Sequence, residues 1–325
     1  MTKLTRILGG ALALPAGWIA YSATQIDHRM TLPPALEAER HTLTSERAGE
    51  LCYYADTRAT GRPLLLIHSI NAAGSSYEMR PIFEAFRGTR PVYALDLPGF
   101  GFSERSERRY SPTLYRDAIV DMLTNGIGEA ADVVALSLSS EFAASAALER
   151  PDRVASLAII SPTGFGYSQS APSPQGAQSN GLSDRAYKVL AFPLWAQGLY
   201  DLLATRRSIR YFLQMNFVGA VDSGLEDYAY ATTHQPGARH APLHFVSGQL
   251  FTSDIRERVY VHLTQPALVI YDHDPNVRFD MLEAMVAAHP NWQAARVSPS
   301  LGLPQFEQMP ALEAALRAFW GSATA

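Results

Sequence analysis

Residues 131–150 read ADVVALSLSSEFAASAALER. The stretch begins as an apolar, strand-forming run that stops at Ser137, and it continues as a helix-like segment rich in small residues. Ala135 and Ser139 stand two positions before and after this serine, so both flanking positions are small. The stretch predicts a buried strand, a sharp turn and a helix. It also raises the question of whether Ser137 is a reactive nucleophile or only the polar end of a strand.

The same alternation of apolar runs and helix-like segments extends along most of the chain. Continuous apolar runs bounded by turn residues indicate strands that are buried on both faces of a sheet. We predict strands, in chain order, at 49–56, 62–69, 91–101 (where the strand runs into a loop), 131–137, 153–161, 266–272 and 292–298. We predict helices at 75–88, 113–128 and 139–150, then one that ends near 288 and one that ends near 320. Buried parallel strands joined by helices make a doubly wound α/β sheet, which is the predicted fold class.

This alternation is interrupted between residues 164 and 262. Residues 164–184 are rich in Ser, Gln, Pro and Gly and predict a long, flexible loop, whereas residues 185–262 are helix-like and aromatic. A helical segment between two parts of one sheet predicts a lid, and we expect most of its aromatic side chains to form a small core of its own. The expected organisation is an apolar segment at 1–30, a spacer at 31–47, an α/β core at 48–166 and 263–325, and a helical lid at 167–262.

The N-terminal segment carries an uncharged run from residue 7 to residue 26, preceded by Lys3 and Arg6. A run of this length can just cross a bilayer, and the preceding positive charges favour a cytoplasmic N-terminus. A membrane anchor is therefore the first hypothesis, and the expected location is membrane-anchored or exported. A cleaved signal peptide and a helix docked on the body of the protein are the alternatives, the last being compatible with a cytoplasmic protein.

Composition excludes several classes of function. The net charge of −4 and the absence of a long basic run give no basis for nucleic-acid binding. The group Arg206, Arg207 and Arg210 is expected to be a solvated helix face. A single cysteine, Cys52, excludes an internal disulfide and a thiolate metal cage. We expect no cofactor, and an apolar small molecule as the binding partner.

In an open α/β sheet, ligands bind at the carboxyl ends of the strands. The polar residues at these ends are His68, Ser69, Asn71, Asp96, Ser137, Asp272, His273 and Asp274. Among them, Ala135 to Ser139 resembles the G-x-S-x-G nucleophile elbow of the α/β-hydrolase fold, with Ala and Ser in the two glycine places.

Three further segments carry the same resemblance. LLLIHSINAAGSSYEM (64–79) resembles the H-G-x oxyanion segment, with Ser69 in the glycine place. LDLPGFGFS (95–103) resembles D-x-x-G-x-G-x-S, and PALVIYDHDP (266–275) resembles the strand that delivers the catalytic acid. The resemblance runs from about 48 to 166 and from 264 to 320, and it places the lid where the family carries one.

This resemblance implies a role for each residue of the site. Ser137 Oγ would attack a carbonyl carbon, and the backbone N–H groups of Leu138 and Ile70 would hold the resulting oxyanion. Asp274 would orient a histidine base. The serine needs such a base because an alcohol is almost wholly protonated at neutral pH.

The expected histidine is missing. Residues 300–310 read SLGLPQFEQMP and resemble the family's G-H-x-P-x-x-E-x-P segment, so that the histidine's place falls on Gly302. The candidate replacement bases are three lid histidines, His234, His240 and His244. His68 is expected to pack structurally and His273 to be a loop residue. A metal site at the lid histidines is not expected, because Pro242 breaks the helical spacing between two of them.

Two functions remain open from the sequence. The first is a serine hydrolase acting on a fairly apolar ester, thioester or lactone through Ser137. The second is a catalytically impaired member of the fold that serves as an apolar-ligand binder or a membrane-tethered accessory protein. Gly302, Ser69 and the non-glycine elbow favour the second function. Non-hydrolytic chemistry on the same scaffold, such as a lyase reaction, is a third alternative.

Overall fold

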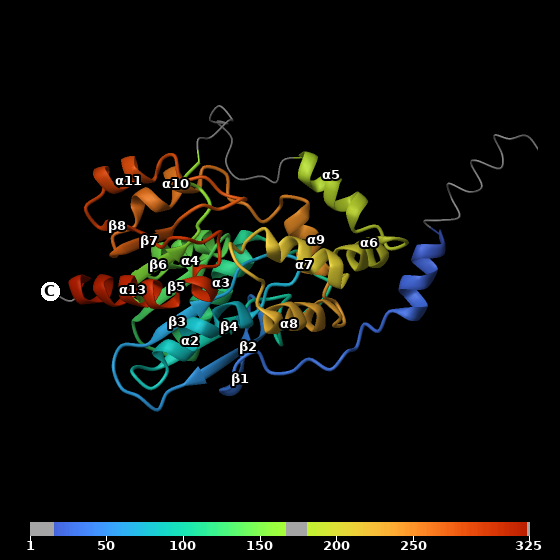
Figure 1. Cartoon of the computed structure of the whole chain (residues 1–325), viewed down its shortest axis with the longest axis horizontal. Coiled ribbons are helices and arrows are strands. Elements are labelled where there is room, and N and C mark those ends of the chain that lie inside the picture. The colour runs from blue at the N-terminus through green and yellow to red at the C-terminus, as the bar shows by residue number, and fades with distance from the viewer. Residues whose placement is uncertain (1–15, 167–180, 324–325) are drawn as a thin grey trace, which may run out of the picture.

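The computed structural model describes residues 16–166 and 181–323, and its centre is one sheet of eight strands (Figure 1). The spatial order of the strands is β1-β2-β4-β3-β5-β6-β7-β8. Their bounds are β1 Glu39–Ser45, β2 Gly49–Asp56, β3 Leu64–Ile67, β4 Val92–Asp96, β5 Ala131–Leu136, β6 Val154–Ile160, β7 Ala267–Tyr271 and β8 Trp292–Arg296. β1 and β2 run antiparallel to their neighbours, and the strands from β4 to β8 are parallel. The predicted, mostly parallel α/β sheet is confirmed.

Helices cover both faces of the sheet, because its central strands are buried on both sides. In β5, Val133 and Ala135 belong to one hydrophobic cluster, while Val134 and Leu136 belong to the other. The first cluster is closed by α3, α4 and α11, and the second by α2 and α13. The helices and helical turns of this core are η1 Ser76–Met79, α2 Arg80–Phe86, α3 Pro112–Asp121, η2 Met122–Ile127, α4 Ser139–Glu149, α11 Leu282–Ala288, α12 Pro304–Glu307 and α13 Met309–Ala323.

A group of short helices, the helical insertion, separates β6 from β7. It consists of α5 Gly181–Leu190, α6 Ala196–Leu203, α7 Arg206–Gln214, α8 Ser223–Thr233, α9 His240–Val246, α10 Ile255–Arg258 and η3 Tyr260–His262. Helix α5 starts at Gly181, so the last four residues of the stretch expected as a loop are helical. The rest of that predicted flexible loop, residues 167–180, lies outside the described residues.

The insertion does not enclose most of its aromatic side chains, contrary to the sequence-based expectation. Tyr200 and Phe217 are buried, but Phe192, Tyr211 and Phe212 are 48%, 64% and 50% exposed. Short helices laid over the edge of a core bury one face and leave the other in solvent. The exposed large apolar side chains of the insertion, here called the insertion apolar surface, are Leu182, Val189, Phe192, Leu194, Trp195, Leu202, Tyr211, Phe212, Met215, Val218, Val246 and Phe251.

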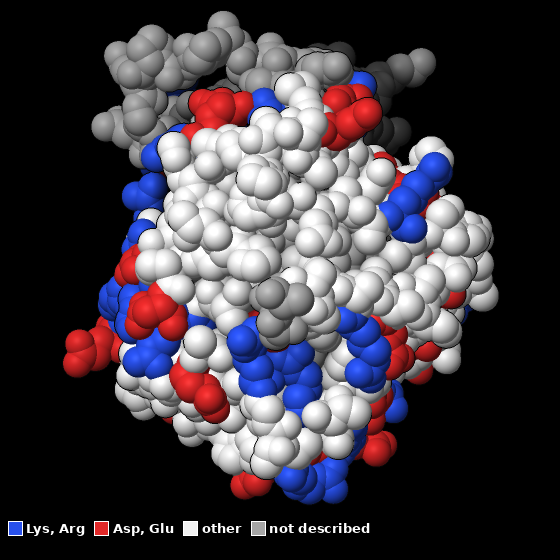
Figure 2. Space-filling view, turned by 90° about the vertical axis from the view of Figure 1, so that its left-hand side faces the viewer, with Lys and Arg blue, Asp and Glu red and all other residues white. Residues whose placement is uncertain are grey.

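The opposite end of the molecule, where α11 and α13 lie, has a different surface. Basic and acidic side chains stand side by side around an uncharged centre on this face (Figure 2). None of the exposed large apolar side chains of the described residues belongs to α11 or α13. The apolar exposure is therefore confined to the insertion and, through Tyr21, to the N-terminal helix.

Two parts of the N-terminal region differ from their expected descriptions. The stretch 31–47 is not only a spacer, because β1 pairs with β2 and extends the sheet. Residues 16–25 form a helix that contacts α6, where Trp18 Nε1 donates to the Gly198 carbonyl at 2.7 Å and Ser22 Oγ donates to Asp201 at 2.5 Å. Within the described ranges, no helix combines the length and apolar character required to span a bilayer.

Candidate active site

Ser137 occupies a strained turn at the carboxyl end of β5. Its φ is +55°, in the left-handed region that residues other than glycine rarely adopt. Its backbone N–H donates to the Ile160 carbonyl of β6 at 2.8 Å, and helix α4 begins two residues later. Such a conformation costs on the order of 1 kcal/mol and persists only where neighbouring structure enforces it. A strained turn between a strand and a helix is what a nucleophile elbow requires, so this geometry is compatible with the predicted role of Ser137.

The two small residues beside Ser137 allow this close approach of strand and helix. Ala135 and Ser139 are completely buried. Ser139 Oγ donates to the His68 carbonyl at 2.6 Å, and so ties the elbow to the loop after β3. A serine in the place of the second glycine thus adds a hydrogen bond that glycine could not make.

The loop after β3 brings the expected oxyanion donors to the same cavity as Ser137. Ile70 and Leu138 both line that cavity. Their backbone N–H groups have no acceptor among the residues that the structure describes. Two unpaired backbone donors beside a serine hydroxyl match the requirements of an oxyanion hole.

Glu78 holds this loop in place, although the sequence did not single it out. Its carboxylate accepts the Ser69 N–H at 2.8 Å and the Asn71 side-chain amide at 2.8 Å. The Glu78 side chain is buried and also lines the cavity. The sequence feature that could have identified it is an acidic residue within a stretch that packs into the core. Buried carboxylates are rare unless they have partners.

His68 is a structural residue of the same loop, as its position after β3 predicted. It is fully buried, Nδ1 donates to the Ser69 carbonyl at 2.7 Å, and Nε2 accepts the Leu97 N–H at 3.0 Å. Burial lowers the pKa of the imidazole. With both nitrogens occupied, His68 is unavailable as a base for Ser137.

Asp274 lies at the carboxyl end of β7, on the other side of the cavity. One of its oxygens, Oδ1, accepts the N–H groups of Asn276 at 2.7 Å and Val277 at 3.1 Å. Burial raises the pKa of its carboxyl, although these two hydrogen bonds act in the opposite direction. His273 beside it is an exposed loop residue, as expected.

Gly302 faces Asp274, as the sequence resemblance requires for the histidine position. A Cβ placed on Gly302 would lie 2.9 Å from Asp274 Oδ2 and 3.2 Å from Asn216 Oδ1. Its φ of +123° is one that residues with side chains rarely adopt. The structure therefore brings Gly302, Asp274 and Ser137 to one cavity, with no side chain at position 302.

Asn216 of the helical insertion stands beside this position. Its Nδ2 donates to the Phe212 carbonyl at 2.8 Å, and its Oδ1 accepts from Asn276 Nδ2 at 3.1 Å. This amide pair links the insertion to the loop that carries Asp274. The contact depends on two segments that are 60 residues apart, so the sequence could not predict it.

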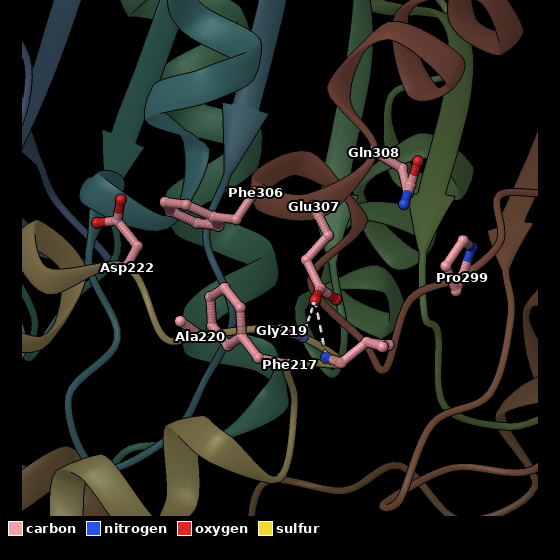
Figure 3. A pocket seen from close by; sticks show the side chains of 9 residues that line it. Phe217, Gly219, Ala220, Asp222, Pro299, Phe306, Glu307 and Gln308 are labelled. Carbon is pink, nitrogen blue, oxygen red and sulfur yellow. Dashed lines mark hydrogen bonds between the residues drawn. The ribbon is translucent and has the colours of Figure 1, made fainter.

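Glu307 fixes the segment that follows Asn216. Its Oε1 accepts the N–H groups of Val218 at 2.7 Å and Gly219 at 2.9 Å (Figure 3). A separate hollow of about 400 Å³ lies next to this contact, and Phe217, Phe306 and Glu307 are among the residues that line it. In the sequence, Glu307 matches the glutamate of the G-H-x-P-x-x-E-x-P segment, and its structural task here is to hold the insertion against the core.

The cavity between these two sides is mainly apolar and has a volume of about 480 Å³. Its polar lining residues are Ser69, Asn71, Glu78, Ser137, Thr163, Asn216, Asp274 and Asn276. Its larger apolar lining residues are Ile70, Leu136, Leu138, Leu203, Ile209, Phe212, Leu213, Met215, Leu225, Phe245, Val246, Phe251, Val277 and Leu303. A space of this size and polarity suits an apolar small molecule that carries one reactive polar group.

No histidine of the described residues lines the cavity. His234 Nδ1 donates to the Tyr230 carbonyl at 2.7 Å, and His244 Nδ1 donates to Gln249 Oε1 at 2.6 Å. Burial lowers the pKa of both imidazoles and of His240. The structure therefore does not bring the three proposed replacement bases to Ser137. Within the described residues, no group of three His, Cys, Asp or Glu side chains could hold a metal ion.

Glu141 is a second buried carboxyl that the sequence did not single out. It lies on α4, one turn after the elbow, and accepts from Thr163 Oγ1 at 2.5 Å and from the Thr252 N–H at 2.8 Å. Thr163 precedes the insertion, and Thr252 lies near its end. Burial raises the pKa of Glu141 to about 7. This carboxyl therefore joins helix α4 to the segments before and near the end of the helical insertion.

Comparison with known protein families supports the fold that the sequence resemblance predicted. The sequence profile of the alpha/beta hydrolase family matches residues 64–315, which is most of the chain. The protein belongs to the alpha/beta hydrolase family.

The chain is also similar to particular proteins. It is 27% identical over 193 residues to a dihydrolipoyllysine-residue acetyltransferase component of an acetoin cleaving system from Pseudomonas putida; the match covers 58% of this chain and 49% of that protein. The chain thus spans only about half the length of this curated relative.

Two solved structures share the fold at low sequence identity. A serine hydrolase involved in carbazole degradation superposes with a TM-score of 0.66 at 14% identity, over 87% of this chain and 99% of that one. A membrane phospholipase A, described as a bacterial virulence factor, superposes with a TM-score of 0.62 at 19% identity, over 99% of this chain and 96% of that one.

Proposed function

We propose that this protein is a serine hydrolase that acts on a fairly apolar ester, thioester or lactone. The observation that carries the proposal is the left-handed backbone of Ser137 at the wall of an apolar cavity, beside two unpaired N–H groups. The names of the structurally similar proteins, a serine hydrolase and a phospholipase A, support acyl transfer as the type of chemistry.

In the proposed reaction, Ser137 Oγ attacks the carbonyl carbon, the C–O or C–S bond of the leaving group breaks, and water then hydrolyses the acyl-serine ester. The N–H groups of Ile70 and Leu138 stabilise the oxyanion, a contribution of about 3–4 kcal/mol per donor where it has been tested. No histidine of the described residues lines the cavity, so the serine proton passes through water to the leaving group. We therefore expect slow acylation that depends on the oxyanion hole and on substrate binding.

The alternative function is an apolar-ligand binder that retains the fold and has lost the catalytic base. The observation that favours it is the bare Gly302 opposite Asp274, with the Asn216 amide in the space beside it. On this alternative, the cavity binds the same class of ligand without cleaving it.

Labelling with a fluorophosphonate probe tests the first function against the second. The parent protein is compared with Ser137→Ala and with Ser140→Ala, whose buried Oγ has no hydrogen-bond partner. A hydrolase is expected to label in the parent and in Ser140→Ala, and to lose labelling in Ser137→Ala. Labelling that persists in Ser137→Ala would overturn the assigned nucleophile.

A second pair of conditions separates an intact scaffold from a misassigned site. Labelling is repeated with added imidazole and with the double variant Gly302→His/Asn216→Ala, in which the amide is removed to make room for the ring. A parent that is silent alone but labels under either condition supports the binder, because its only defect is the missing base. Silence under all conditions in folded protein would contradict the oxyanion hole and elbow as described.

A further inference from the structure

The insertion apolar surface is not explained by the cavity alone. Part of it surrounds the turn between α5 and α6, where Phe192 and Trp195 lie with ring centroids 4.6 Å apart. Trp195 Nε1 donates to the Val189 carbonyl, so the indole is held in place rather than loose. Exposed apolar patches of this kind mark interaction sites in soluble domains.

The same surface borders the entrance of the cavity. Phe212, Met215, Val246 and Phe251 line the cavity and are also between 37% and 50% exposed. These four side chains therefore belong both to the cavity wall and to the outer surface. A ligand that moves from the surface to Ser137 can stay in contact with apolar side chains along its path.

The charge of the helices that carry this surface is positive, although the chain as a whole has a net charge of −4. Helices α5 to α7 carry five basic residues, Arg185, Lys188, Arg206, Arg207 and Arg210, against Asp184 and the buried Asp201. Arg206 pairs with Asp227 and Arg210 with Glu226 of α8. For Arg185, Lys188 and Arg207 no acidic partner is found in the described part of the chain. Such a surface complements anionic headgroups.

The N-terminal run also reaches the body of the protein at the insertion. Its described part, residues 16–25, contacts α6 through Trp18 and Ser22, and Tyr21 on it is exposed. Tyrosine and tryptophan at such a position are the residues enriched at a membrane–water interface. The uncharged residues from 7 onward thus precede a helix that lies beside the same surface.

From these observations we propose that the insertion apolar surface docks on an anionic phospholipid bilayer, with the mouth of the cavity turned toward the lipid. The docking proposal depends only on the apolar and charged residues of this surface. The consequence that an apolar ester enters the cavity directly from the bilayer rests on the proposed hydrolase function. The C-terminal end of the molecule, with its interleaved charges, would then face away from the membrane (Figure 2).

Vesicle flotation of the full chain tests the proposal. The vesicles are phosphatidylethanolamine and phosphatidylglycerol at 3:1, and phosphatidylcholine alone for comparison. The parent is expected to float with the anionic vesicles, and the variant Phe192→Ser/Trp195→Ser/Phe212→Ser/Val246→Ser to bind at least tenfold more weakly. The variant's folding is checked by its melting temperature.

A matched pair of single substitutions tests the charge contribution. Arg207→Gln is expected to weaken binding to the anionic vesicles several-fold, whereas Arg317→Gln on α13, which changes the net charge equally, is expected to leave it unchanged. Ser137→Ala is expected to float like the parent, because docking does not need the serine. Flotation therefore tests docking, and fluorophosphonate labelling separately tests the hydrolase proposal.

Three outcomes would overturn the proposal. The first is a parent that stays unbound with both vesicle types. The second is a folded quadruple variant that floats as well as the parent, which would assign membrane binding to the N-terminal run alone. The third is a parent dimer in size-exclusion chromatography that the four substitutions dissociate, which would assign the surface to a second copy of the chain.

Discussion

The two sides of the cavity differ in how completely they are built. On the nucleophile side, Ser137 is held in a left-handed conformation, and Ser139 ties the turn to the loop that carries Ile70. On the base side, Asp274 is held by two N–H groups, but Gly302 opposite it has no side chain. Both sides are compatible with the proposed site, but no histidine of the described residues lines the cavity between them.

This difference follows from what each part does for the fold. The elbow and the strand ends are formed by backbone hydrogen bonds between β5, β6 and β7, so they cannot be lost without disturbing the sheet. A base is a single side chain at the cavity wall, and its removal leaves the sheet unchanged. A strained turn with only a structural task would be better served by glycine, which favours a use for the Ser137 hydroxyl.

Replacement of Ser137 gives the largest expected effect and tests the nucleophile side. We expect Ser137→Gly to lose fluorophosphonate labelling completely, because no other serine occupies the strained turn. The same change should raise the free energy of unfolding by roughly 1 kcal/mol, since glycine tolerates a positive φ. Urea denaturation measures the second effect. Unchanged labelling would contradict Ser137 as the nucleophile. A loss of stability would contradict the strain at this turn.

Imidazole added to the solution should act as the base that the cavity wall beside Gly302 does not provide. We expect imidazole to increase hydrolysis of p-nitrophenyl butyrate by about 10²-fold, a typical gain from general base catalysis, with saturation as the position beside Gly302 fills. The imidazole nitrogen accepts the proton of Ser137 Oγ. Asn216→Ala, which opens that position, should lower the imidazole concentration needed. A linear increase that is equal in Ser137→Ala would show catalysis in solution only.

The pH dependence of stability tests the contacts that Glu141 makes between helix α4 and the helical insertion. Glu141 has a folded-state pKa of about 7, above its usual value, because it is buried. The folded state therefore holds this proton more tightly than the unfolded state, and stability falls as pH rises through about 7. Ionisation of Glu141 is expected to cost up to about 3 kcal/mol between pH 5 and 8, whereas the buried histidines, whose pKa is lowered, act in the opposite direction.

The matched variant for this prediction is Glu141→Gln, which keeps the size of the side chain and an acceptor for Thr252. Its unfolding free energy should fall less, or rise more, between pH 5 and 8 than that of the parent, as measured by urea denaturation at each pH. An identical pH profile in both proteins would show that Glu141 does not titrate in this range.

The smallest effect is expected at Asp274. Without a histidine to orient, Asp274→Asn should change the basal hydrolysis rate less than about threefold, whereas in a complete triad the same type of change costs about 10⁴-fold. In the presence of imidazole the variant should lose most of the rescue. A large loss of basal rate would mean that Asp274 already works with a base in the parent.

Much of the fold was predictable from the sequence because it depends on local patterns. Apolar runs such as 131–137 mark strands buried on both faces, and their alternation with helices predicted the mostly parallel sheet that the structure confirms. β1 was missed and assigned to a spacer, because its residues alternate between exposed and half-buried positions at the edge of the sheet. An edge strand carries little of the apolar signal that marks a central one.

The sequence by itself determined which residues stand at the strand ends, Ser137, Ile70 and Asp274, and the family resemblance of residues 300–310 pointed to Gly302. Parallel strands bring their carboxyl ends to one edge, so a position along the chain already implies a place in the cavity. Only the tertiary structure decided the contacts of Glu78, Glu141 and Asn216, the orientation of the histidines in the insertion, and the exposure of its aromatic side chains. These depend on which face of each short helix meets the core, and a hydropathy pattern does not specify that face when both faces carry apolar residues.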